Sequence, residues 1–225
     1  GAWANSVLKE YISRDRLDPR DAGLATRLVY GVIQNRGKLD FYLKQLLKGK
    51  MKDLQSVVRD ILHLGLYQIY ELDKIPDSAA VNESVTLAKK YCRWQRSAPG
   101  LVNAVLRNAV RTKGQLKAPV TLEDRYSHPK ALIDLLKKDI GSARLLGMMQ
   151  ADNAIADTVI QVNTLRITAA QLLLRLEREG VSAKPHGWMQ DCLILSGTGN
   201  LEKLPSFQEG LFYVQDPASR LSMQC

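Results

Sequence analysis

The segment from Leu54 to Leu72 is the most apolar stretch of the chain and limits the possible folds more than any other feature. A helix that is apolar around most of its circumference must be covered by neighbours on several sides. We therefore expect this segment to be the central helix of a bundle. Gly65 within it predicts a close approach by a neighbouring helix, and His63 predicts a hydrogen-bonded core residue. The apolar side chains that span more than one face are Val57, Val58, Ile61, Leu62, Leu64, Leu66, Tyr67 and Ile69.

Helix signals also precede this segment. A first short helix is expected from Trp3 to Tyr11. A second is expected to begin with Asp18 as its N-cap and Pro19 as its first residue, and to continue to Asn35. The predicted core stripe of this second helix is Leu24, Leu28 and Val32.

Three further helices are expected in the first half of the chain. One covers residues 39–48, after a helix stop at Gly37. The next begins with Asp77 as a candidate N-cap and has Ala80, Val81, Val85 and Ala88 at helical spacing, and the last opens at Pro99 and Gly100. Together the signals predict about six helices and no strand, an all-α bundle over residues 1–113.

The second half of the chain has a different pattern. Residues 114–128 contain turn and breaker residues without a sustained period, and we interpret them as a linker. Amphipathic helices are expected at 130–140, 143–153 and 168–179, and strands at 157–165, 192–196 and 212–216. Helices and strands alternate, so residues 129–225 are predicted to form a small α+β domain. The fold class is therefore multi-domain, an all-α bundle followed by a small α+β domain.

Positive charge is concentrated in the first half of the chain. The net charge is +9, and residues 1–113 hold 20 Lys and Arg against 11 Asp and Glu, whereas residues 114–225 hold 12 against 12. No Asp or Glu occurs between Ser84 and Leu122. A basic domain beside a neutral one indicates a polyanionic partner for the first.

Basic and amide side chains of this acid-free stretch are the candidate site. Arg107 and Arg111 follow Asn103 at four-residue spacing on one helix face, where they could bind phosphates and base edges together. Charge spacing alone fits a solvated helix face equally well. The candidate phosphate contacts are Lys89, Lys90, Arg93, Arg96, Arg107, Arg111 and Lys113, and the candidate base or sugar contacts are Asn103 and Asn108.

The residues themselves indicate no catalytic or metal site. Three histidines lie far apart, Gly197-Thr198-Gly199 lacks the rest of a phosphate-binding motif, and the cysteines form no C-x-x-C pair. None of Cys92, Cys192 and Cys225 has neighbours that would lower its pKa. There is no apolar run of roughly 18 residues and no signal-peptide pattern. We expect a cytoplasmic binding protein without a membrane segment, with no catalytic residue, metal or cofactor in this chain.

Several long strings resemble one known family. LATRLVYGVIQNRGKLD (24–40), ILHLGLYQIYELDKIPDSAAVNESVTLAKKY (61–91) and GLVNAVLRN (100–108) are similar to the N-terminal NusB-like domain of the Sun/RsmB family of bacterial 16S ribosomal-RNA cytosine-5 methyltransferases. YSHPKALIDLL (126–136), QVNTLR (161–166) and GLFYVQDPASRLS (210–222) resemble the segment of that family between the NusB-like domain and the methyltransferase core.

The resemblance implies a parent enzyme that uses S-adenosylmethionine, with ribosomal RNA as the partner. The family's D-x-C-A-A-P-G-G-K loop and its Thr-Cys and Pro-Cys motifs are not in this sequence, so the chain is expected to be a fragment without the catalytic half. Gln161 stands where the family usually has Arg, which weakens one expected RNA contact. Asn163 and Arg166 are further candidate RNA contacts. A monomer is favoured.

Three functions remain open at this point. The first is an RNA-binding region that positions the substrate of the methyltransferase. The second is a protein-binding adaptor, because NusB-like folds also serve in transcription antitermination. The third is a scaffold that only stabilises the catalytic domain. Salt dependence separates the first two, since phosphate contacts weaken steeply with salt and an apolar protein interface does not.

Overall fold

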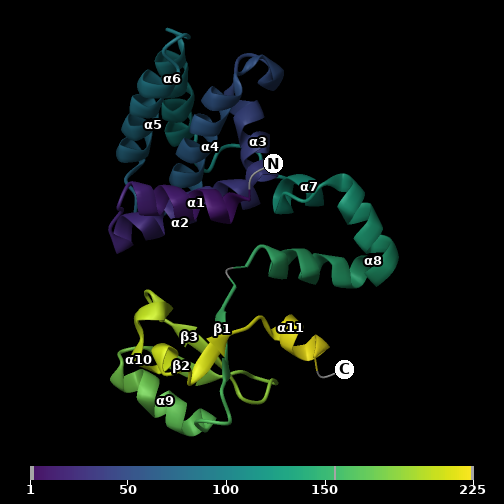
Figure 1. The fold of residues 1–225 in the computed structure, drawn as a ribbon. Coiled ribbons are helices and arrows are strands. Elements are labelled where there is room, and N and C mark those ends of the chain that lie inside the picture. The colour runs from purple at the N-terminus through teal and green to yellow at the C-terminus, as the bar shows by residue number, and fades with distance from the viewer. Residues whose placement is uncertain (1–2, 155, 224–225) are drawn as a thin grey trace. The chain divides into compact units, whose positions relative to one another are not determined.

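The computed structural model describes residues 3–154 and 156–223. Two compact units divide the chain, Gly1–Asn153 and Ala154–Cys225. Each is described by itself (Figure 1). Every regular element among the described residues of the first unit is a helix, and the second unit combines a small sheet with helices, so the predicted fold class is confirmed.

The first unit contains eight α-helices and one 3-10 helix within its described residues. Two helix starts were predicted well. Asp18 caps its helix by accepting hydrogen bonds from the backbone N–H groups of Arg20 and Asp21, and a later helix begins at Ala98, one residue before the predicted Pro99. The elements are α1 (Ala4–Arg14), α2 (Pro19–Gln34), α3 (Arg36–Leu46), η1 (Met51–Asp53), α4 (Ser56–Glu71), α5 (Asp77–Tyr91), α6 (Ala98–Arg111), α7 (Leu122–Tyr126) and α8 (Lys130–Asp152).

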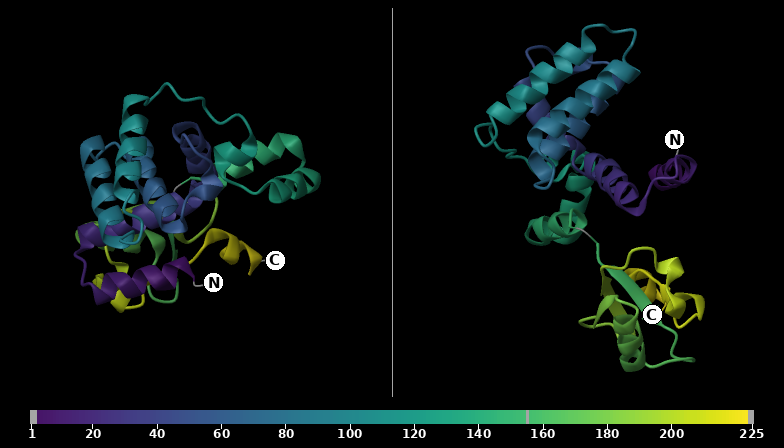
Figure 2. Two further views of the ribbon diagram at one scale, coloured as in Figure 1. Left: turned by 90° about the horizontal axis from the view of Figure 1, so that it is seen from above. Right: turned by 90° about the vertical axis from the view of Figure 1, so that its left-hand side faces the viewer.

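Helix α4 is the centre of the first unit, as its apolar circumference predicts. It packs against α2, α3, α5 and α6, and Figure 2 shows this group of helices from two further sides. Gly65 is confirmed as a point of close approach, because a Cβ there would lie 2.5 Å from Cδ1 of Leu106 and 2.9 Å from Oγ of Ser84. The buried residues of α4 are Val58, Ile61, Leu62, His63, Gly65, Leu66, Tyr67 and Ile69.

His63 is a hydrogen-bonded core residue, as expected. Its side chain is 1% exposed, and Nε2 lies 2.8 Å from Oδ1 of Asp40 on α3. Burial alone would raise the pKa of the Asp40 carboxyl, but the hydrogen bond and charge of His63, with the charges of Arg36 and Arg59, outweigh burial and lower that pKa. The pair therefore stabilises the packing of α3 on α4.

Removing the Asp40 carboxyl is expected to destabilise the first unit. Asp40→Ala leaves the buried Nε2 of His63 without a partner, which should lower the free energy of unfolding by about 1–3 kcal/mol in urea titrations. Asp40→Asn keeps an acceptor oxygen and should cost less. Because the folded pKa of Asp40 lies below the ordinary value of 3.8, its contribution is present above that pH and is lost as the pH falls through the folded value. Wild-type stability in Asp40→Ala would contradict this role.

Three local predictions for the first unit were wrong. Asp77 is the first residue of α5 rather than its N-cap, because Pro76 has the extended backbone of the cap position. Gly37 lies inside α3, which follows α2 directly after Asn35. Leu24 is 40% exposed, whereas Leu28 and Val32 of the same stripe pack against the core. These errors concern boundaries and one edge of a stripe, where local signals compete with packing.

Residues 114–153 form an extension of the helical unit. The segment expected as a linker contains α7, which packs on α3, and the side chain of Gln45 bonds the backbone of Lys117 at 3.0 and 3.1 Å. Helix α8 bends at Gly141 (Figure 1), which has a φ of 77°, a backbone conformation that glycine adopts more readily than other residues. The compact division falls after Asn153, whereas the predicted start of the second domain is residue 129.

The second unit is an antiparallel four-stranded sheet in the order β2-β3-β1-β4. Helix α9 packs against the sheet through Leu172 and Leu176, which meet Ile160 and Leu193 in one apolar cluster. A capping box formed by Thr168 and Gln171 begins this helix. The elements are β1 (Thr158–Val162), α9 (Ala169–Arg178), β2 (Ser182–Pro185), β3 (Cys192–Ser196), η2 (Leu201–Lys203), α10 (Pro205–Gln208), β4 (Phe212–Val214) and α11 (Pro217–Ser222).

Candidate nucleic-acid interface

The acid-free stretch forms an antiparallel pair of helices. Helices α5 and α6 lie side by side, joined by the turn of residues 92–97. The far ends of the pair are joined by an ion pair of 3.3 Å between Nζ of Lys113 and Oδ1 of Asp77. The chain reversal has a direct consequence for the predicted site: residues near the turn and residues near the end of α6 lie at opposite ends of α5, roughly 20 Å apart for a helix of this length.

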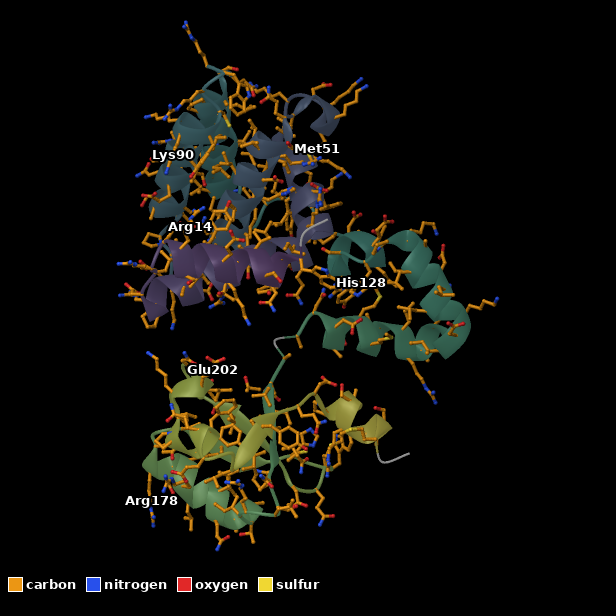
Figure 3. All side chains as sticks on the ribbon, viewed as in Figure 1. Arg14, Met51, Lys90, His128, Arg178 and Glu202 are labelled. Carbon is orange, nitrogen blue, oxygen red and sulfur yellow. The ribbon has the colours of Figure 1, made fainter. Side chains whose placement is uncertain are left out.

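Four of the predicted phosphate contacts gather at the turn. Each is exposed, and within residues 3–154 and 156–223 no side-chain hydrogen bond or ion pair engages any of them. Nζ of Lys90 lies 5.2 Å from the ring centroid of Tyr91. Besides the hydrogen bond from Arg14, the charge of Lys90 also acts on Asp15 and lowers the pKa of that carboxyl, but no described carboxylate forms an ion pair with any of the four, so their N–H groups are available to an anion. This group, the turn cluster, consists of Lys89, Lys90, Arg93 and Arg96; Lys90 is labelled in Figure 3.

The other predicted contacts lie towards the end of α6 and already have partners. Nε of Arg107 donates to Oδ1 of Asn103 at 2.9 Å, and a terminal nitrogen of Arg111 donates to Oδ1 of Asn108 at 2.8 Å. Arg107 therefore bonds an amide on its own predicted helix face, whereas Arg111 bonds Asn108. The acceptor oxygens of both amides are occupied, which leaves their N–H groups and the remaining guanidinium N–H groups as donors.

A shallow groove lies beside these α6 residues. It encloses about 360 Å³ between the first turns of α5 and the last turns of α6. Its polar lining combines one carboxylate with two guanidinium groups, so it is less positive than the turn cluster. The lining residues are Asp77, Ser78, Val81, Asn82, Arg107, Val110 and Arg111.

The two candidates of the second unit serve its own fold. Nδ2 of Asn163 donates to the carbonyl of Gly210 at 2.8 Å, and Arg166 donates to the carbonyl of Glu209 at 2.9 Å. Gln161 is 3% exposed, and its Oε1 accepts from Sγ of Cys192 at 3.1 Å. These bonds fix the chain around β1 and β4, and the RNA contacts of Asn163 and Arg166 stay predictions.

No metal site appears among the residues described. They contain no group of three or more His, Cys, Asp and Glu side chains that could hold a metal ion. Cys92 and Cys192 are buried free thiols, and burial raises the pKa of each; Cys225 lies outside the described residues. No described helix is long and apolar enough to cross a membrane.

One exposed side chain at the turn cluster was not among the predicted contacts. Trp94 is 69% exposed, and its indole Nε1 donates to Oε1 of Gln55 at 2.8 Å. Its position between Arg93 and Arg96 was the available signal, since aromatic residues interleaved with cations are typical of nucleic-acid surfaces.

Comparisons with known proteins agree with this architecture. The NusB family model matches residues 1–111, and the model of the ferredoxin-like domain of RsmF/B-like methyltransferases matches residues 128–202. The second match begins before α8, so it starts ahead of the second compact unit.

Similar curated proteins carry one name. The ribosomal RNA small subunit methyltransferase B of Vibrio cholerae is 34% identical over 94% of this chain and 48% of its own length. That of Pseudomonas putida is 33% identical over 92% of this chain and 47% of its own length. A probable ribosomal RNA small subunit methyltransferase B of Bacillus subtilis is 31% identical over 98% and 49%. The chain thus spans about half the length of these relatives.

One solved structure has the same fold. The crystal structure of PH0851 superimposes with a TM-score of 0.62 and 20% sequence identity, covering 95% of this chain and 48% of that protein. At this level of identity the likeness supports the fold.

Proposed function

Since the chain belongs to the Sun/RsmB family and corresponds to its N-terminal region, we propose that its first unit binds ribosomal RNA and positions it for a methyltransferase. The turn cluster carries the proposal: its four cations are exposed and form no side-chain hydrogen bond or ion pair among the described residues, on a stretch that has no Asp or Glu between Ser84 and Leu122. Contacts with phosphates fix the register of a nucleic acid without reading its sequence.

The proposed division of labour follows from the chemistry. Methylation of a cytosine requires the base to leave its stack and enter a pocket. A basic helical surface can hold the surrounding RNA while another part of the enzyme performs that step. We propose that the whole protein is a cytoplasmic 16S ribosomal-RNA cytosine-5 methyltransferase and that S-adenosylmethionine is its methyl donor. We assign no residue of this chain to that cofactor, and we favour a monomer.

A double variant of α6 tests the contribution of the two arginines that bond Asn103 and Asn108. Arg107→Ala with Arg111→Ala should weaken binding to a small-subunit ribosomal-RNA hairpin roughly 10- to 100-fold at low salt, in fluorescence anisotropy, because about two phosphate contacts are lost. Both side chains are exposed, so the bundle should stay folded. Lys137→Ala with Lys138→Ala on α8 removes the same charge from exposed positions and is the matched control.

Different results favour different functions. Unchanged affinity in the α6 double variant would remove Arg107 and Arg111 from the interface. Equal losses in both double variants would indicate attraction by net charge alone. An adaptor function predicts weak RNA binding and a protein partner whose affinity changes little with salt. A scaffold function predicts that deleting the bundle lowers the melting temperature of the full enzyme and leaves its RNA affinity unchanged.

A further inference from the structure

Trp94 lies in the turn between α5 and α6 and combines exposure with a fixed position. With 69% of its surface exposed, the indole presents most of its apolar area to solvent. Single exposed apolar residues are common on protein surfaces, so exposure alone carries no function. The hydrogen bond and the surrounding charges distinguish this side chain.

The hydrogen bond fixes the ring to the body of the bundle. Nε1 of Trp94 donates to Oε1 of Gln55 at 2.8 Å, which joins the turn to the start of α4. Gln55 occupies the cap position of α4 but makes no side-chain cap bond, since its amide oxygen receives the indole N–H. The polar edge of the ring is therefore satisfied within the protein, and what remains for a ligand is the π surface.

The cations of the turn cluster surround this ring in the chain. Arg93 precedes it, Arg96 follows two residues later, and Lys89 and Lys90 belong to the last turn of α5. A second aromatic ring, that of Tyr91, is 49% exposed beside them. Sites for single-stranded nucleic acid combine aromatic rings, on which bases stack, with cations that follow the backbone.

We propose that Trp94 is a stacking platform for an unpaired base, and that the first unit selects RNA with single-stranded nucleotides over a continuous duplex. The inference rests on the proposed RNA-binding function and specifies that the turn cluster binds RNA with unpaired nucleotides. Bases inside an A-form helix are stacked on one another and hide their faces, whereas bases in loops and bulges can stack on a side chain.

Another tryptophan of the chain serves as an internal control. Trp188 in the second unit is 66% exposed, about as much as Trp94. Its ring packs edge-on against His186 with centroids 5.0 Å apart, and residues 185–191 contain no Lys or Arg. Trp188→Ala therefore removes an equally exposed ring from a site without clustered cations.

Binding to two RNAs of equal charge tests the inference. One is a hairpin with an unpaired loop, and the other is a fully paired duplex with the same number of phosphates. Trp94→Ala should weaken hairpin binding about 5- to 150-fold and leave duplex binding unchanged. Trp94→Phe should keep most of the affinity for the hairpin, and Trp188→Ala should keep all of it. Melting curves of each variant show that the bundle is intact.

A second readout observes the ring directly. In the Trp3→Phe, Trp188→Phe background, Trp94 is the remaining tryptophan, and stacking on a base should quench its fluorescence with the hairpin but not with the duplex. Three results would contradict the stacking platform: the hairpin binds without quenching, Trp94→Ala has wild-type affinity for both RNAs, or Trp94→Ala loses affinity for both RNAs equally. Each of these results leaves the RNA-binding function standing. If the wild type binds neither RNA at low salt, the proposed function itself fails, and the platform with it.

Discussion

Gly65→Ala is expected to lower the free energy of unfolding of the first unit by about 1–3 kcal/mol, the usual cost of overpacking a well-packed core. The added Cβ would lie 2.5 Å from Cδ1 of Leu106, which is fully buried, and 2.9 Å from Oγ of Ser84. Neither neighbour is at a free surface where it could turn away. Urea unfolding followed by the helical circular-dichroism signal measures the loss.

Gly100→Ala is the matched control for this substitution. Gly100 also lies within a helix, α6, but nothing lies within 4 Å of an added Cβ there. Alanine in an open helical position is favoured over glycine by roughly 0.5–1 kcal/mol, so the control should be as stable as the wild type or slightly more stable. If Gly65→Ala behaved like the control, the close contact of α4 with α5 and α6 would be wrong.

Removing all four cations of the turn cluster should have the largest effect on RNA binding. The quadruple alanine variant is expected to bind the ribosomal-RNA hairpin roughly 100- to 1,000-fold more weakly near 0.1 M salt, because about four phosphate contacts and their counterion release are lost. All four positions are exposed, so the fold should be retained. The substituted residues are Lys89, Lys90, Arg93 and Arg96.

A charge-matched variant on α8 is the control for the turn cluster. It removes four exposed cations from the same unit, one of which forms only a surface pair with Asp134, and such pairs contribute little to stability. We expect a much smaller change in affinity than for the turn cluster. A loss as large as that of the turn variant would mean that net charge, rather than the turn, attracts the RNA. The control residues are Lys130, Lys137, Lys138 and Arg144.

Features set by local chemistry could be predicted from the sequence. The apolar circumference of 54–72 predicts a central helix because only burial on several sides satisfies it. Gly65 and His63 were assigned from their place on that helix, and the Asp18-Pro19 pair marks a helix start that local bonds alone determine. The family resemblance was carried by long strings and is confirmed by both matched domain models.

Features that depend on chain direction and on partners could not be predicted. One-dimensional charge spacing groups Lys89 with Lys113, yet the reversal at the turn places them at opposite ends of α5, and Lys113 pairs with Asp77. Strand β2 was missed because it is a short edge strand that is mostly exposed and ends at Pro185, so it lacks an apolar pattern. The place of Trp94 between Arg93 and Arg96 is a sequence signal, but its fixed position depends on the bond to Gln55, a partner that is distant in the sequence.

The central claim is that the first unit binds RNA through the exposed cations of the turn cluster and of α6. Titration of the wild-type chain with the ribosomal-RNA hairpin at several salt concentrations tests it most directly. Four to seven phosphate contacts predict a slope of log affinity against log salt between roughly −3 and −6, with micromolar or tighter affinity at low salt. A flat salt dependence, or no binding at low salt, would contradict the claim.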